Sequence, residues 1–162
     1  MSDEIHVRLA TPRDAEVLIR FNSAMALETE RKALLPEVVS AGVHYLLNHP
    51  GAGFYVIAEV GTAVAGALMI TNEWSDWRNG NFWWIQSVYV HPEFRRRGVY
   101  RQLYRTLQTL AARDPAVCGF RLYVERDNLR AQATYRASGM AETRYFVFEE
   151  LKPGIRFYTS AG

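Results

Sequence analysis

The segment from residue 85 to residue 110 constrains the fold of this chain more than any other. An apolar run at residues 85–90 is typical of a buried strand, and His91-Pro92 ends it. Three arginines and Gly98 follow, and apolar residues then recur at helical spacing. The first amides of a helix have no partner within it and carry partial positive charge, so a strand, a basic turn and a helix in this order build an anion site. The sequence therefore predicts a ligand that carries phosphate.

Composition narrows the class of protein. The 162 residues are 49% hydrophobic and 22% charged, which is typical of one globular domain, here expected to span residues 1–162. The net charge of +2 is too small to indicate a nucleic-acid partner. The one cysteine, Cys118, excludes an internal disulfide and fits a reducing compartment. The start of the chain is polar and no apolar run approaches the roughly 20 residues that span a bilayer, so we expect a cytoplasmic protein with no membrane partner.

Hydrophobic periodicity and turn signals predict a mixed α/β order, β-α-α-β-β-β-α-β-α-β-β. The expected strands cover residues 5–9, 54–60, 63–71, 82–90, 117–124, 142–151 and 155–159. The expected helices cover residues 12–27, 36–47, 98–113 and 128–138, and residues 28–35 form the bend between the first two. Residues 72–81 are expected to form a polar and aromatic loop.

Two motifs then follow one another in this order. The first is Arg95-Arg96-Arg97-Gly98-Val99-Tyr100, directly after the strand; the second is Asn128, Ala131, Tyr135 and Gly139-Met140. With them the chain resembles the GNAT superfamily of N-acetyltransferases, which use acetyl-CoA. The resemblance covers nearly all of the chain, and departs from the family pattern at Tyr100, where a small residue is usual, and at Met140, where phenylalanine is commoner. It implies a GNAT-like fold in which the fourth and fifth strands splay apart.

The resemblance also implies which residues bind acetyl-CoA. The pantetheine arm should pair with the backbone of Val88, Tyr89 and Val90 in the gap between the splayed strands. The pyrophosphate should lie against residues 95–100, namely Arg95, Arg96, Arg97, Gly98, Val99 and Tyr100. Asn128, Ala131 and Tyr135 complete the expected set.

Acetyl transfer to an amine requires an acid for the departing thiolate and a base for the ammonium. Tyr135 is the candidate acid, because a phenol can donate to a thiolate and because Tyr135 lies two helical turns after Asn128. The strand ending at Val90 has no acidic residue. Glu28 and Glu30 are therefore the next candidate bases, with Glu28 preferred, since the bend after the first helix usually borders the acceptor site in such enzymes. Glu73, Asp76 and a water chain are alternatives.

The acceptor site is expected to use Glu28, Glu30, Trp74, Trp77 and Trp84. All four tryptophans of the chain fall between Glu73 and Trp84, and aromatic faces beside carboxylates suit a cationic amine. Packing within a hairpin or a subunit interface would explain the same cluster. Adjacent Trp83 and Trp84 face opposite sides of a strand, so at most one of them lines a pocket.

The leading hypothesis is an acetyl-CoA-dependent N-acetyltransferase that acts on a primary amine of a small molecule, less so on a protein amine, by direct attack in a ternary complex. A non-catalytic acyl-CoA-binding module is the alternative, because the usual strand carries no base. The four histidines show no metal-ligand spacing, so no metal is expected. By resemblance the chain is also a candidate homodimer.

Overall fold

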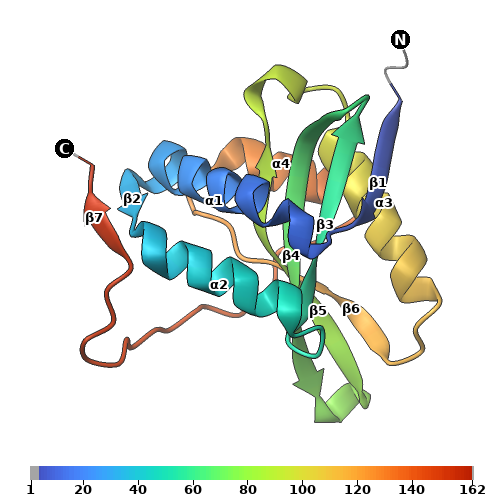
Figure 1. Cartoon of the computed structure of the whole chain (residues 1–162). Helices are drawn as coiled ribbons and strands as arrows, with labels where there is room; N and C mark the ends of the chain where they lie inside the picture. The colour runs from blue at the N-terminus through green and yellow to red at the C-terminus, as the bar shows by residue number, and fades with distance from the viewer. Residues whose placement is uncertain (1–3, 162) are drawn as a thin grey trace. The chain divides into compact units, whose positions relative to one another are not determined.

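A five-stranded sheet forms the centre of the larger of two units (Figure 1). The computed structural model describes residues 4–161; residues 1–3, part of the polar start, and residue 162 lie outside the described range. Met1–Leu122 and Phe157–Gly162 make up the larger unit, here the sheet unit. Tyr123–Arg156 makes up the smaller, here the α4 unit. The expectation of one domain over residues 1–162 stays a prediction.

The sheet has the order β1-β3-β4-β5-β6, antiparallel throughout except for the parallel pair β5–β6. Its strands are β1 (Ile5–Leu9), β3 (Gly53–Val60), β4 (Ala63–Ser75), β5 (Gly80–Val90) and β6 (Val117–Arg121). A second, two-stranded sheet joins β2 (Lys32–Leu34) to β7 (Tyr158–Ser160) in antiparallel register.

Helices cover both faces of the large sheet. Side chains alternate along a strand, so Tyr55 and Ile57 of β3 share a core cluster with α1 (Ala15–Glu30) and α2 (Pro36–Asn48). The opposite face meets α3 (Val99–Ala112), whose Val99 lies against Gly66 of β4. Short 3-10 turns precede α1 (Pro12–Asp14), join β4 to β5 (Asp76–Arg78) and follow β5 (Pro92–Phe94).

An ion pair fixes the start of α1. Asp14 accepts hydrogen bonds from the Thr11 amide (2.7 Å) and from Arg8 of β1 (2.8 Å), and Arg8 also bonds Glu59 of β3 (2.8 Å). Asp14 is only 7% exposed, so its charge depends on these partners. The Arg8 guanidinium outweighs burial and holds the pKa of the Asp14 carboxyl below its usual range.

The predicted mixed α/β class and the splay of the fourth and fifth strands are confirmed, and these two strands are β5 and β6. Several expectations were wrong in detail: the strand expected at residues 117–124 ends at Arg121 as β6. The loop expected at residues 72–81 is shorter, because β4 runs to Ser75 and β5 begins at Gly80. The bend at residues 28–35 contains the end of α1 and the strand β2. Residues 142–151 form no strand, and of residues 155–159 only the last two belong to β7.

Candidate active site

A β-bulge divides β5 into two parts. Gln86 stands opposite Met69 of β4 and Tyr89 stands opposite Ala67, so two residues of β5 face Leu68 alone. Ser87, within the bulge, has the left-handed φ of 51°, which is uncommon for a residue other than glycine. Because the bulge adds one residue, Gln86 and Tyr89 both point to the face that α1 and α2 cover.

The bulge coincides with the end of pairing between β5 and β6. These strands pair only where residues 81–84 of β5 meet β6, although β5 continues to Val90. Within the described residues, no strand pairs with this edge of β5 over residues 85–90. The backbone of Val88, Tyr89 and Val90, predicted to hold pantetheine, thus lies on an edge of β5 that no described strand covers, where the Val90 carbonyl accepts from Arg95 Nε.

The arginine turn between β5 and α3 has the backbone geometry of an anion site. Arg96 (φ 63°) and Gly98 (φ 81°) are left-handed, and α3 begins at Val99 directly after them. Left-handed residues next to a helix start aim successive amides into one concavity. Arg96 and Arg97 are exposed there, so the residues fit the diphosphate of CoA.

Arg95 has a different environment from its two neighbours. Its Nε donates to the carbonyl of Val90 (2.9 Å), and its Nη2 donates to Glu28 at the end of α1 (2.8 Å). Glu28 also accepts a hydrogen bond from the Tyr89 hydroxyl (3.0 Å). The structure therefore brings together the candidate base, one pantetheine-strand residue and one arginine of the anion turn.

The two partners of Glu28 control its charge. Partial burial raises the pKa of the Glu28 carboxyl, but the hydrogen bonds from Arg95 and Tyr89 outweigh this and hold that pKa below its usual value. Burial and the neighbouring carboxylate raise the pKa of Tyr89. Glu28 is thus ionised at neutral pH, and Tyr89 is a phenol that donates to it.

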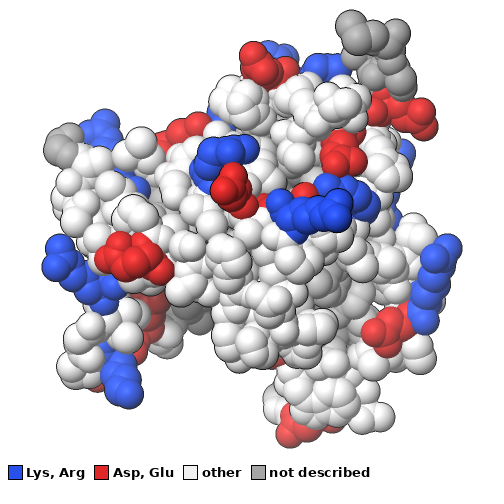
Figure 2. Space-filling view, viewed as in Figure 1, with Lys and Arg blue, Asp and Glu red and all other residues white. Residues whose placement is uncertain are grey.

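The other candidate carboxylates also have positive or donor partners. Glu30 pairs with Lys32 (2.9 Å), and the Asp76 carboxylate accepts from the Trp77 amide (2.9 Å). Glu73 accepts from Trp84 Nε1 (3.2 Å) and from Arg121, whose guanidinium lies 3.7 Å from the centre of the Phe82 ring. On the face drawn in Figure 2, Lys and Arg atoms are likewise interspersed with Asp and Glu atoms.

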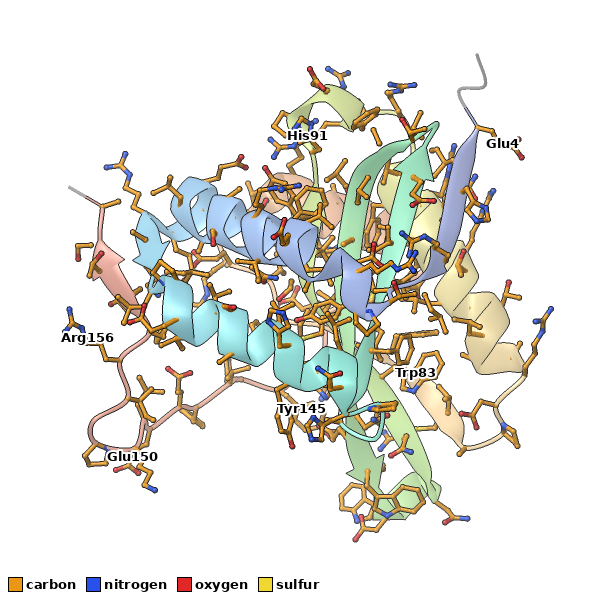
Figure 3. All side chains as sticks on the ribbon, in the orientation of Figure 1. Glu4, Trp83, His91, Tyr145, Glu150 and Arg156 are labelled. Atoms are coloured by element: carbon orange, nitrogen blue, oxygen red, sulfur yellow. The ribbon has the colours of Figure 1, made fainter. Side chains whose placement is uncertain are left out.

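The tryptophans do not gather around Glu28. Trp83 is buried among aromatic rings, 5.2 Å from Phe54 and 6.2 Å from Phe120 (Figure 3). Trp74 and Trp77 are exposed at the tip of the β4–β5 hairpin, and Trp74 pairs with Asn81. Tyr89 lies eight positions after Asn81 in β5, roughly 26 Å along a strand. Among the three tryptophans predicted to bind the acceptor, only Trp84 lies on the α1/α2 face.

Within the α4 unit, the second motif forms a capped helix, α4 (Leu129–Ala137). Asn128 Oδ1 accepts from the Ala131 amide (3.1 Å), so Asn128 acts as the N-cap. Gly139 ends the helix with a left-handed φ of 95°. Burial raises the pKa of Tyr135, so its hydroxyl keeps its proton at neutral pH, as a general acid requires.

A hollow of about 280 Å³ lies on the α1/α2 face of the sheet unit, beside the bulge. Its apolar lining comes from Val39, Val43 and Met69. Its polar lining comes from Asn22, Tyr55 and Ser87, and Gly42 of α2 completes it. Sequence reasoning missed these residues. Gly42, a glycine within a predicted helix, was the available signal.

Comparisons with known proteins identify the fold and its family. The model of the acetyltransferase (GNAT) family matches residues 22–140. The chain belongs to this family. A possible acetyltransferase from Clostridium difficile 630 is 41% identical, with 91% of this chain and 97% of that chain covered and a TM-score of 0.85. A search of curated proteins gave no match.

Two more distant solved structures share the fold of this GNAT protein. An aminoglycoside N-acetyltransferase in complex with CoA is 16% identical over 94% of this chain and 97% of its own, with a TM-score of 0.74. A predicted acetyltransferase from Clostridium acetobutylicum, with acetyl-CoA, is 14% identical over 91% of this chain and 96% of its own, with a TM-score of 0.75.

Family membership makes the chain an acetyltransferase that uses acetyl-CoA. Among residues 4–161, no helix is both long and apolar enough to span a membrane. Over the same residues, no three His, Cys, Asp or Glu side chains gather as a metal site would need.

Proposed function

We propose that this GNAT protein transfers the acetyl group of acetyl-CoA to a primary amine of a small molecule, by direct attack in a ternary complex. The observation that carries the proposal is the bulge in β5. On one side, the edge of β5 beyond it is open to an extended ligand. On its α1/α2 face, Ser87 lines a hollow that can admit an acceptor. One strand thus serves both substrates.

For the cofactor-binding residues other than Arg95, we propose the roles expected from the sequence. We infer that Val88, Tyr89 and Val90 pair with pantetheine through their backbone. The diphosphate would lie against the arginine turn, on the amides of residues 96–100 and the guanidinium groups of Arg96 and Arg97. Arg95 differs, because its side chain already bridges Val90 and Glu28. We infer that it positions the turn against α1. Acetyl-CoA supplies the activated acetyl thioester.

In the reaction, the acceptor nitrogen forms a bond to the acetyl carbon and the carbon–sulfur bond breaks. We assign Tyr135 to protonate the leaving sulfur. Its raised pKa keeps the hydroxyl protonated. The leaving thiolate, whose thiol has a pKa of about 8.5, is a weaker base than a phenolate, so Tyr135 would give up its proton only as the carbon–sulfur bond breaks and charge develops on the sulfur. An amide on β5, near Tyr89 or Val90, would stabilise the oxyanion.

We keep Glu28 as the candidate acceptor of the ammonium proton. Its low pKa ensures that it is ionised, but the same hydrogen bonds make it a weak base. Its contact with Tyr89 places it against β5, whereas Glu73 and Asp76 bond partners nearer the hairpin tip. Water reaching Glu28 would carry the proton onward to solvent.

Other predictions stay open to experiment. A protein amine is the less favoured acceptor, and the non-catalytic acyl-CoA-binding module is the competing function. A homodimer is supported by exposed apolar side chains at residues 145–148 of the α4 unit. A cytoplasmic location and the absence of nucleic-acid and membrane partners stay predictions.

A thiol-release assay with acetyl-CoA and a panel of amines tests the function. We expect Tyr135→Phe to lower turnover about 10²-fold, the usual contribution of a general acid, without changing the affinity for CoA in calorimetry. Tyr145→Phe is the matched control, because it removes a hydroxyl from an exposed tyrosine of the same unit. CoA binding without turnover for any amine would favour the binding module, and loss of CoA binding in Tyr135→Phe would assign Tyr135 to binding.

A further inference from the structure

Gly42 lies in the middle of α2, where nothing in the packing requires a glycine. Its φ is not left-handed, and a Cβ added there would meet no atom within 4 Å. A glycine inside a helix is less stable than an alanine, because it loses more backbone entropy on folding. Gly53 is a contrast: its φ is 153°, and an added Cβ would clash with the carbonyl oxygen of Ile70. Gly42 lines the hollow beside the bulge, and an added Cβ there would meet open space.

The position of the hollow connects it to the chemistry. Ser87 lines it, and Val88, the next residue, begins the backbone segment assigned to pantetheine. α1 contributes Asn22, α2 contributes Gly42, and β3 and β4 contribute Tyr55 and Met69. A molecule seated here would meet the α1/α2 face of the strand that binds the cofactor.

The lining indicates the chemistry of the occupant. Val39, Val43 and Met69 are apolar, and the polar groups of Asn22, Tyr55 and Ser87 carry no charge at neutral pH. Burial raises the pKa of Tyr55 further, so it stays a phenol. None of the residues lining the hollow is acidic, and Glu28, Glu30 and Glu73 each pair with a cation. The hollow therefore lacks the several carboxylates that would select a polycation.

The volume of the hollow limits the size of its occupant. A volume of about 280 Å³ lies just below the range of roughly 300–1,000 Å³ typical of pockets for drug-sized ligands. One ring or a short branched chain fits this space.

We propose that the acceptor is a compact primary amine with an uncharged, apolar body, such as an arylalkylamine, and that Gly42 sets the size limit of that body. The inference rests on the proposed acetyl transfer, whose acceptor it specifies. Polyamines and aminoglycosides are poor acceptors, because their additional ammonium groups would meet no free carboxylate among the residues that line the hollow.

Thiol release is measured for 2-phenylethylamine, ethylamine, spermidine and an aminoglycoside, with wild type and Gly42→Leu. We expect phenylethylamine to have the highest kcat/KM. Gly42→Leu should raise its KM at least tenfold and leave the KM for ethylamine and for acetyl-CoA within about twofold. Ala41→Leu is the matched control, because Ala41 is exposed on the same helix and does not line the hollow. Gly42→Ala should raise the Tm, since the alanine favours the helix and meets open space.

Binding of phenylethylamine by calorimetry separates this inference from the proposed function. Tight binding that Gly42→Leu weakens tenfold, with no turnover, would support the hollow and contradict the transferase. Turnover highest for spermidine or the aminoglycoside would support the transferase and overturn the inference. An unchanged KM and Kd for phenylethylamine in Gly42→Leu would also overturn it.

Discussion

The sheet unit and the α4 unit both contain strongly strand-forming segments, but only the sheet unit buries them. All of the buried side chains among residues 4–161 lie in the sheet unit, whereas residues 123–156 contain none. Yet residues 145–148, Tyr-Phe-Val-Phe, are as strongly strand-forming as the buried run Val56–Ala58 of β3. Residues 56–58 pair with β4, whereas residues 145–148 of the α4 unit pair with no strand among the described residues. Strand propensity thus leads to a strand only where a partner strand pairs with it, and the buried core belongs to the sheet unit.

The largest expected effect tests the stability of the sheet unit. Leu103 of α3 is 0% exposed, so Leu103→Ala should lower the free energy of unfolding by about 3–4 kcal/mol through lost burial and a residual cavity. Denaturant titration measures it. Gln108→Ala, at an exposed position of the same helix, is the control and should change stability by less than about 0.5 kcal/mol. Equal effects would show that α3 does not anchor the core.

The ion pair at the start of α1 gives the second effect. Asp14→Asn should cost about 2 kcal/mol at pH 7, because Arg8 and the Thr11 amide lose a buried carboxylate acceptor. Glu59→Gln, which removes only the more exposed partner of Arg8, should cost less than half of that.

The pH dependence follows from the lowered pKa of Asp14. A carboxyl whose pKa is lower in the folded than in the unfolded state stabilises the protein fully above its ordinary pKa of 3.8. That contribution disappears as the pH falls through the folded-state pKa. Unfolding curves of wild type and Asp14→Asn should therefore differ at pH 7, begin to converge as the pH falls below about 4, and meet only below the folded-state pKa of Asp14. A difference that stays constant with pH would assign the effect to packing rather than to charge.

Prediction from sequence succeeded where the signal is local. The helix starting at Pro36, the hairpin of β3 and β4, and the cap at Asn128 depend on turn residues and periodicity within one segment. The splay of β5 and β6 came from the family resemblance. The bulge at Ser87 was not predictable, because it exists only in the pairing of two strands. Ser87 and Val88 of β5 face Leu68 of β4 once the two strands are aligned, and the sequence of β5 alone does not show that alignment. The pairing of Arg95 with Glu28, 67 positions apart, likewise depends on tertiary structure.

Substitution of Phe148 should have the smallest effect on stability and gives the sharpest test of the contrast between the sheet unit and the α4 unit. Its side chain is 95% exposed, so Phe148→Ser should change the free energy of unfolding by less than about 0.5 kcal/mol. A strand with one buried face would lose more, since burying a Phe side chain contributes roughly 1.5–3 kcal/mol. Measuring stability at two protein concentrations separates the alternatives. A loss above about 1 kcal/mol that grows with concentration would show that a second copy covers residues 145–148. The same loss at both concentrations would show that this segment packs within its own chain, and the contrast between the two units would fail.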